Sequence, residues 1–217
     1  MSPIVRWLPA LTASLLTTVL LAALALLIAT LAGIVAGLLL LHGPRPLRAL
    51  IRLYVDLIRG VPILVLLYAW YFVSSVVGSG LDPLAAAVAA LSVFAAAHVT
   101  EIVRGGIGSL SPHTAEAAQS TGLTAAQRFR LVTVPLVLPR VVPPWVNTAI
   151  EVVKATSLAS LIGVQDLIFR MQSAIGSNPL GDTMPFYLFA AAMYLMIGLG
   201  LSWIGARIER RYRYLEY

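Results

Sequence analysis

The sequence predicts an all-α integral membrane protein with about five transmembrane helices. Of its 217 residues, 59% are hydrophobic and 11% are charged, and the mean hydropathy is +0.91. A soluble domain carries roughly 25% charged residues, so this chain has too few polar side chains to cover its surface in water. Several apolar stretches reach the ~20 residues that cross a bilayer. These observations exclude a soluble enzyme, and the length predicts one membrane domain over residues 1–217.

Residue types that support common catalytic chemistry are missing or scattered. The chain has no cysteine, which excludes disulfides, a thiol nucleophile and a cysteine metal site. Its histidines, His42, His98 and His113, are far apart, so we expect neither a metal site nor catalytic residues. A net charge of +6 is compatible with nucleic-acid binding. In a membrane protein it more often reflects arginines on cytoplasmic loops, so we expect no nucleic-acid partner.

The first span is expected at about 14–41, after a short interfacial segment at 7–12. A signal peptide is the competing interpretation, but no small-residue cleavage site follows a short apolar core. Gly33 and Gly37 have the spacing of a helix-packing motif. In a chain so rich in alanine and glycine, we favour a chance occurrence.

The other spans follow from breaker clusters and apolar periodicity. The segment 42–46 contains two prolines and ends the first helix. An amphipathic helix bearing Arg48, Arg52 and Asp56 then runs into the second span. The four later spans are expected at about 53–77, 84–102, 141–166 and 184–206. They are joined by a Gly/Ser-rich turn at 78–83, a polar segment at 103–140 and a turn-rich loop at 170–183.

The arginines predict the orientation. With five spans, eleven arginines lie on one side, namely Arg45, Arg48, Arg52, Arg104, Arg128, Arg130, Arg140, Arg207, Arg210, Arg211 and Arg213. The other side has only Arg6 and Arg170. The positive-inside rule therefore puts the N-terminus outside, and the 103–140 segment and the C-terminus in the cytoplasm. The basic tail at 207–217 is interpreted as an anchor at the membrane lipid surface, without a specific lipid site.

Two short helices separated by a glycine are predicted in residues 111–135. Ser111 or Thr114 can cap the first helix, and Gly122 is suited to end it. Thr124 and Gln127 match a capping box that starts the second helix. Four prolines then punctuate the return to the membrane.

The same segment resembles the EAA loop of ABC importer permeases. Glu116-Ala117-Ala118, three residues, Gly122, nine residues and Val132-Thr-Val-Pro135 match Glu-Ala-Ala-x3-Gly-x9-Ile-x-Leu-Pro. The departures are conservative, because valines stand in place of isoleucine and leucine. The loop also meets the context that such a motif needs, since it lies between two spans on the predicted cytoplasmic side.

Four further segments resemble the polar amino-acid permeases within that family. They are Arg59-Gly-Val-Pro62 with Ile63-Leu-Val, Glu101-Ile-Val-Arg-Gly-Gly-Ile107, Pro143-Pro144 with Asn147, and Lys154-Ala-Thr-Ser-Leu-Ala-Ser-Leu-Ile-Gly-Val164. The chain departs from the family pattern at Val61, His98, His113-Thr114 and Ala155. These departures leave the architecture untouched and put the substrate in doubt.

This resemblance implies a type I ABC importer permease in a bacterial inner membrane. Such a permease pairs with a second permease subunit, identical or sister, and works with two cytoplasmic ATPase subunits and an extracytoplasmic solute-binding protein. The chain lacks a Walker A motif, so ATP and Mg²⁺ would be bound by the ATPase and this chain would need no cofactor. The resemblance assigns ATPase coupling to Thr114, Glu116, Ala117, Ala118, Gly122 and Pro135.

Charges inside the spans are the second functional signal. Glu151 and Lys154 lie three residues apart on one helix face, and each costs about 2.5–3.5 kcal/mol at mid-membrane. They either neutralise each other at a dimer seam or take part in the substrate path. Pro62 releases backbone groups next to Arg59, so Arg59–Ile63 is either a wall for a zwitterion or a site where an arginine reaches to the interface.

The resemblance implies a mid-membrane pocket around Ile63, Asn147 and Thr148. Because Ile63 and Thr148 are not acidic, a basic amino acid is a weaker expectation. The full set of substrate-path candidates is Arg59, Pro62, Ile63, His98, Glu101, Asn147, Thr148, Glu151, Lys154, Thr156 and Ser157. The predicted function is the permease subunit of an amino-acid importer. The alternatives are a permease for an osmoprotectant or amino-acid derivative, and a membrane scaffold without transport.

Overall fold

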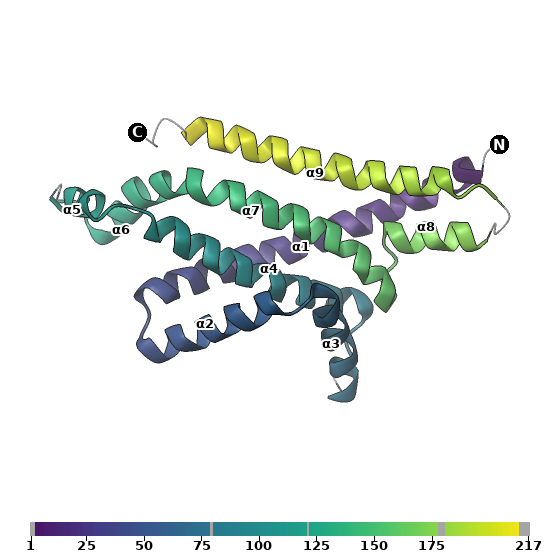
Figure 1. The fold of residues 1–217 in the computed structure, drawn as a ribbon, viewed down its shortest axis with the longest axis horizontal. Coiled ribbons are helices and arrows are strands. Elements are labelled where there is room, and N and C mark those ends of the chain that lie inside the picture. Colours follow the sequence, from purple (N-terminus) through teal and green to yellow (C-terminus); the bar gives the residue numbers. More distant parts are fainter. Residues whose placement is uncertain (1–2, 79, 121, 178–180, 213–217) are drawn as a thin grey trace.

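Four long helices lie side by side in the computed structural model, which describes residues 3–78, 80–120, 122–177 and 181–212 (Figure 1). They are α1 (Pro3–His42), α4 (Pro83–Gly108), α7 (Val134–Thr156) and α9 (Met184–Tyr212). The shorter elements are α2 (Arg45–Gly60), α3 (Ile63–Val76), α5 (Pro112–Ser120), α6 (Ala125–Arg128), the π-helix η1 (Phe129–Thr133), the 3-10 helix η2 (Ser157–Ile162) and α8 (Leu167–Gly176). The described residues contain no strand, which confirms the all-α class.

Four segments are long and apolar enough to cross a membrane: Ile4–His42, Pro83–Gly108, Ala125–Ile162 and Met184–Tyr212. The stretch expected as the second span, 53–77, is instead divided between α2 and α3. Val61 is extended, with φ −100° and ψ 131°, and Pro62 has no N–H to continue the helical ladder. The 14-residue α3 therefore points away from the long helices (Figure 1).

The other helices differ from the sequence expectation mainly at their ends. α4 continues to Gly108, and α7 begins at Val134, so both extend into the segment expected at 103–140. The first half of the loop expected at 170–183 is helical, because α8 occupies Leu167–Gly176. Ser79, residues 178–180 and the end of the tail at 213–217 lie outside the described residues.

α4 forms the centre of the bundle. Asp82 caps it by accepting a hydrogen bond from the Ala85 N–H (2.8 Å), and Pro83 occupies its first turn. Its alanine-rich sequence presents a low surface against α1, α3 and α7. Ala86, Ala87, Ala90 and Leu91 are completely buried. α4 thus supplies much of the buried core, and α1, α3 and α7 pack around it.

At Gly33 and Gly37, α1 approaches α4 too closely to leave room for a side chain. A Cβ built on Gly33 would lie 2.6 Å from the Val99 Cβ, and one on Gly37 would lie 2.8 Å from the Val103 Cβ. The chance interpretation of this glycine pair is therefore wrong. Small residues here let two spanning helices pack closely, as in other membrane proteins.

The outer faces of α1 and α9 are apolar and exposed. Leu16, Leu27 and Leu31 of α1 are 58–61% exposed, and Leu195 and Leu199 of α9 are 59–61% exposed. Side chains of this kind are stable when they face lipid. Exposed charged side chains lie on other surfaces, on α2, α4, α5, α7 and the last turns of α9.

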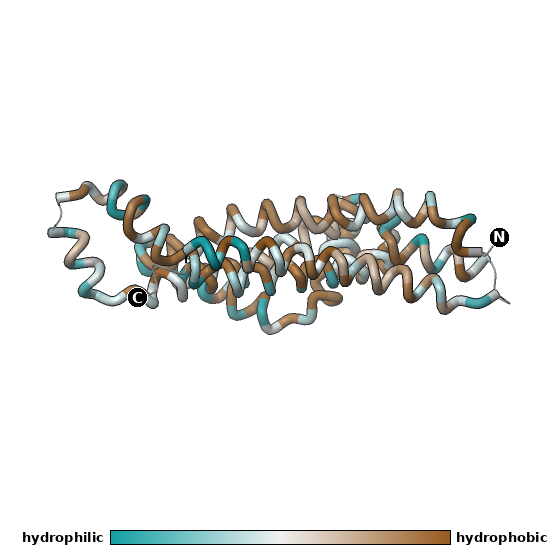
Figure 2. Tube along the Cα trace, turned by 90° about the horizontal axis from the view of Figure 1, so that it is seen from above, coloured by the Kyte–Doolittle hydropathy of each residue, from teal (hydrophilic) through white to brown (hydrophobic). Residues whose placement is uncertain are grey.

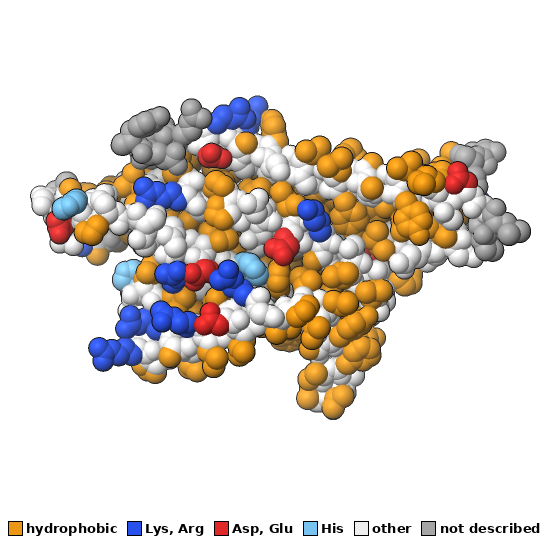
Figure 3. Space-filling model, viewed as in Figure 1, with side chains coloured by type: hydrophobic (Ala, Val, Ile, Leu, Met, Phe, Trp, Pro, Cys, Tyr) orange, Lys and Arg blue, Asp and Glu red, His pale blue; other side chains and the backbone are white. Residues whose placement is uncertain are grey.

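The two ends of the bundle differ in charge. The hairpin, defined as α5, α6 and their connecting turn, projects from one end (Figure 2). Most of the Lys and Arg side chains on the viewed face gather at this hairpin end, near the end of α9 (Figure 3). The start of α1 and α8 lie at the opposite end (Figure 1).

Candidate functional site

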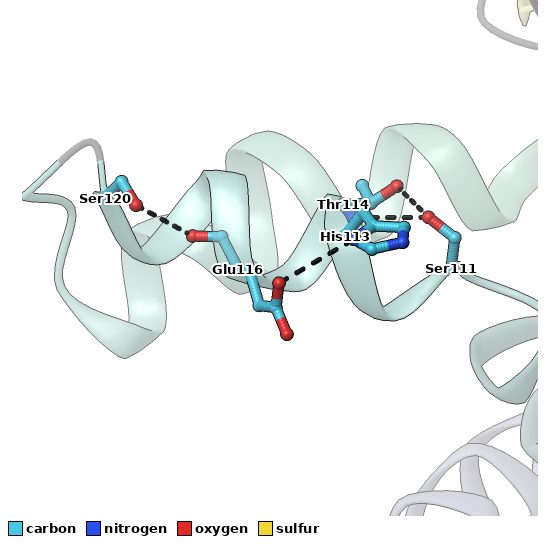
Figure 4. Close-up of polar contacts among 5 residues, drawn as sticks. All are labelled: Ser111, His113, Thr114, Glu116 and Ser120. Atoms are coloured by element: carbon cyan, nitrogen blue, oxygen red, sulfur yellow. Dashed lines mark hydrogen bonds and ion pairs between the residues drawn. The ribbon is translucent and has the colours of Figure 1, made fainter.

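The hairpin begins with a capped helix. The Thr114 N–H donates to Ser111 Oγ (3.2 Å), and the hydroxyls of the two residues lie 2.9 Å apart (Figure 4). Of the two expected caps, Ser111 therefore fills the role for α5. Pro112 occupies the first position, where its missing N–H costs no helical hydrogen bond.

Glu116 is presented to solvent from the middle of α5. Its side chain is 73% exposed, and its Oε2 lies 3.8 Å from Nδ1 of His113, which is 93% exposed (Figure 4). An exposed pair of this kind contributes little to stability. Ala117 beside it is also exposed, whereas Ala118 is buried. α5 thus presents an exposed carboxylate and, at Ala117, a small exposed side chain that a protein partner can contact.

The turn of the hairpin depends on Gly122 and Thr124. Gly122 has φ +71°, in the left-handed region that glycine adopts without strain. Thr124 and Gln127 form the predicted capping box, with the Thr124 N–H donating to Gln127 Oε1 (2.9 Å). Thr121 lies outside the described residues. Local sequence therefore accounts for the turn at Gly122 and for the start of α6 after Thr124.

Pro135 lies where the hairpin joins α7. It is in the first turn of α7, directly after the π-helix η1, in which the Val134 N–H donates to the Phe129 carbonyl. A π-turn is a frequent feature of functional sites in helices. Pro139, Pro143 and Pro144 follow inside α7, and each removes one backbone donor. The helix that connects the hairpin to the membrane domain is thus irregular along its first half.

One face of α7 carries a polar stripe, formed by Asn147, Glu151 and Lys154. All three side chains are exposed, and their spacing of four and three residues puts them on one side of the helix. Two ion pairs are seen among the described residues, Arg104–Glu101 and His113–Glu116, and neither includes Glu151 or Lys154. The polar stripe therefore carries two opposite charges that do not neutralise each other within the chain.

Three other substrate-path candidates near α7 are turned toward the backbone. Thr148 is buried and donates to the Pro144 carbonyl (3.2 Å), and Thr156 is completely buried and donates to the Val153 carbonyl (2.7 Å). Ser157 donates to the Lys154 carbonyl (2.6 Å). Thr148 and Thr156 are thus buried away from the exposed polar stripe, whereas Ser157 lines an open groove together with Lys154.

α4 presents a second pair of charges. Arg104 binds Glu101 through two hydrogen bonds, of which Nε to Oε2 measures 2.8 Å. The side chains of Arg104 and Glu101 are 42% and 32% exposed. His98, one turn earlier, lies against the Phe94 ring with 4.5 Å between the ring centroids. Glu101 therefore has a partner within its own helix.

The break between α2 and α3 brings a basic surface toward α4. Arg59 is exposed in the last turn of α2, and the charges of Arg59 and Arg52 act on Glu101. Pro62 is exposed, and Ile63 is half-buried against the central core. Arg59 on α2 and the Glu101–Arg104 pair on α4 thus belong to one charged region.

An open groove of about 280 Å³ lies beside the polar stripe. It is bounded by α7 with η2, by α8 and by α9. Its polar lining comes from Lys154, Ser157, Tyr187 and Tyr194, and its apolar lining from Ile168, Met171, Ala190 and Ala191. A cationic side chain on a partly apolar wall suits the carboxylate end of a small amphipathic solute.

Sequence reasoning missed Asp166. Its side chain is completely buried before α8, where it caps the helix by accepting from the Phe169 N–H (2.9 Å). The available signal was an aspartate directly before the apolar run Leu167-Ile168-Phe169. Among the described residues, no group of three or more His, Asp or Glu side chains is arranged to hold a metal ion.

Comparison with known proteins gives a consistent result. A family model described as binding-protein-dependent transport system inner membrane component matches residues 29–214. The chain is 36% identical over 180 residues to the probable glutamine ABC transporter permease protein GlnP of Bacillus subtilis (strain 168), covering 82% of this chain and 83% of that protein.

Two further similarities extend over nearly the whole chain. The L-cystine transport system permease protein TcyL of Bacillus subtilis (strain 168) is 32% identical over 218 residues, covering 97% of this chain and 90% of that protein. A crystal structure of an amino acid ABC transporter with histidines has a TM-score of 0.86 and 30% identity, covering 96% of each chain.

Proposed function

Because this chain belongs to the family of binding-protein-dependent transport system inner membrane components, we propose that it is the membrane-spanning permease subunit of an ATP-driven amino-acid importer. The chain resides in the inner membrane and is a transport subunit, not an enzyme. The observation that carries the proposal is the hairpin. It exposes Glu116 on a capped helix, and Gly122 turns the chain sharply behind it.

The hairpin is the docking element for a cytoplasmic ATPase subunit in this proposal. α5 presents Glu116 and Ala117 on an exposed surface, and the Pro135 junction connects the hairpin to α7. Closure of two ATPase subunits around ATP and Mg²⁺ would move α5, and α7 would carry that motion into the membrane as a rigid-body change. The hairpin end is accordingly cytoplasmic.

The polar stripe is the part of the substrate path that recognises a zwitterion. Lys154 can bind the carboxylate of an α-amino acid, and Glu151, one turn away, can bind its ammonium group. Buried or membrane-embedded charges persist where they face a partner or a water-filled cavity, and neither residue forms an ion pair with another described residue. The relatives are named for glutamine and L-cystine, so a small polar amino acid is the proposed substrate class.

A complete transporter in this proposal contains a second permease subunit, identical or sister, two ATPase subunits and an extracytoplasmic solute-binding protein. The exposed polar stripe supports the second permease, because a path between two subunits would shield these charges from lipid. ATP and Mg²⁺ belong to the ATPase, and this chain holds no cofactor of its own.

Reconstitution with the partner subunits in proteoliposomes tests the function. Glu116→Lys and Gly122→Arg are expected to insert normally and to lose ATP-driven amino-acid uptake, since the first reverses the exposed charge and the second strains the turn. Glu209→Lys, a charge reversal of the same size on α9, serves as the control and is expected to keep uptake. Normal uptake by both hairpin variants would contradict the proposal, and an inserted parent chain that never imports would favour a membrane scaffold.

A further inference from the structure

Asp166 has one carboxylate oxygen without an evident role. The residue lies in the short connection between the span that ends at Ile162 and α8, and its side chain is 0% exposed. Oδ1 accepts from the Phe169 N–H, as described above. Oδ2 is also buried, and within the described part of the chain it has no hydrogen-bond partner. A buried carboxylate with an unsatisfied oxygen is costly and calls for an explanation.

Polar side chains from three other elements converge on Asp166. The next residue, Leu167, donates its N–H to Oγ1 of Thr18 on α1 (3.1 Å). The hydroxyl of Tyr194 on α9 is buried near the side chains of Asp166, Thr18 and Thr156, and among the described residues it also has no hydrogen-bond partner. We call Thr18, Thr156, Asp166 and Tyr194 the polar node. It joins the start of α8 to α1, α7 and α9.

α8 is otherwise held by apolar contacts. Leu167, Met171 and Ala174 are 0–4% exposed and belong to one cluster with Leu11 of α1 and Phe186 of α9. Met171 also lines the groove beside Lys154, and the Tyr194 side chain lines it from α9. α8 is therefore one wall of the groove, and the polar node lies at the N-terminal end of that wall.

Burial dominates the electrostatics of Asp166. Lys154 and Tyr187 line the groove, Arg170 on α8 donates to Gln165 Oε1 (2.5 Å), and Tyr194 is the titratable side chain that acts on Asp166. Residues 7–41 of α1, which include Thr18, contain no charged residue. Desolvation by burial raises the pKa of Asp166 to about 6, and hydrogen bonds from the α8 backbone oppose that rise.

We propose that the polar node is a latch that holds α8 against α1 and α9, and that ionisation of Asp166 loosens it and opens the groove beside Lys154. The docked and released states of α8 differ in the surroundings of the carboxyl group. Docked, it is buried and favours the neutral form. Released, it meets water and the neutral form is no longer favoured. The existence of the latch rests on the fold, and its part in transport rests on the proposed function.

The direction of the pH effect follows from these two states. The docked state binds the Asp166 proton more tightly, because its pKa of about 6 lies above the ordinary value of about 3.9. Docking is therefore strongest below about pH 4, weakens as the pH rises toward 6, and changes little above that. Asp166→Asn keeps a neutral side chain of the same shape, so its α8 should stay docked over the whole range.

The docking of α8 can be measured with a cysteine introduced on its buried side, because the chain has no natural cysteine. Ala174→Cys places a thiol at a position that is 0% exposed, and Ser173→Cys places one at an exposed neighbouring position. Both full-length variants are assembled with their partner subunits in proteoliposomes and labelled with a hydrophilic maleimide between pH 4 and 7. The ratio of the two labelling rates removes the intrinsic effect of pH on thiol reactivity.

The ratio is expected to rise about 10-fold or more between pH 4 and 6.5, which is within the 100-fold limit of a two-unit difference in pKa. Asp166→Asn should keep the ratio low and flat. A flat ratio in the parent chain, or the same rise in Asp166→Asn, would overturn the latch. The parent profile decides the question even if Asp166→Asn does not fold.

Uptake measured in the same vesicles separates the latch from the proposed function. If the labelling ratio rises with pH as expected but the parent transporter imports no amino acid, the latch is supported and the proposed function is contradicted. A flat labelling ratio in vesicles that import normally contradicts the latch alone.

Discussion

At the scale of single residues, the proposed transport function depends most on two charged side chains of α7, Glu151 and Lys154. An ion pair within the chain would reduce the cost of keeping both at membrane depth, yet none joins them among the described residues. The same spacing lets them bind the two ends of an α-amino acid. This makes recognition of a zwitterion the more economical explanation, and it leaves the dimer seam as the competing one.

Lys154→Gln and Glu151→Gln are expected to raise the KM for amino-acid uptake about 10-fold or more, with a smaller change in the maximal rate. Each removes one charge-assisted hydrogen bond to the substrate, worth about 1.5–3 kcal/mol. Concentration-dependent uptake in proteoliposomes measures this. Lys154→Arg is the control, because it keeps the charge and should keep more of the affinity. If both Gln variants instead lose maximal rate in proportion to a loss of assembled complex, the two charges have a structural role at the contact between permease subunits.

Gly122 has a separate, conformational role. Gly122→Ala is expected to destabilise the hairpin by about 1–2 kcal/mol, because a Cβ is strained at φ +71°. Hydrogen exchange of the α5 amides should accelerate by roughly 5–30-fold. Gly105→Ala, in open space within α4 and without a positive φ, should not have this effect. Unchanged exchange in Gly122→Ala would show that the turn does not need glycine.

At the scale of elements, close packing of α1 on α4 is the feature with the clearest energetic consequence. Gly37→Ala is expected to cost about 1–3 kcal/mol, since its Cβ would lie 2.8 Å from the Val103 Cβ and 2.9 Å from the Thr100 carbonyl oxygen. The thermal midpoint in detergent should fall by several degrees. Gly200→Ala on α9 meets open space and should leave it unchanged. Equal midpoints for both variants would contradict the packing interpretation.

Local patterns predicted some elements well. The capping box of α6 and the left-handed Gly122 depend on neighbouring residues, so the sequence alone indicated both. The similarity to known permeases likewise followed from short motifs with fixed spacing.

Long-range contacts explain what was missed. α8 packs against α1, and a hydrogen bond joins Leu167 to Thr18, 149 positions earlier in the chain. Local sequence periodicity does not predict such a contact. The contact of Gly33 with Val99 has the same character. The division of α2 from α3 was foreseen only as released backbone at Pro62, because the length of apolar sequence on both sides suggested one continuous span.

The whole molecule has a charged hairpin end and a less charged opposite end, and the proposed orientation in the membrane rests on that asymmetry. Single cysteines at Ser120 and Ser177, both exposed, are expected to be labelled from opposite sides of the membrane. In intact cells stripped of the outer membrane, an impermeant maleimide should label Ser177→Cys and spare Ser120→Cys until the membrane is opened. The reverse pattern would invert the proposed orientation.

The central claim is that the hairpin docks an ATPase subunit, and photo-cross-linking in native membranes tests it most directly. A photoreactive residue replaces the exposed Ala117, and a second variant replaces the exposed Gln172 on α8 as the control. Mass spectrometry of the products should identify an ATPase subunit attached at position 117 and none at position 172. Products at position 117 that contain only lipid or the chain itself, while the complex remains assembled, would contradict the claim.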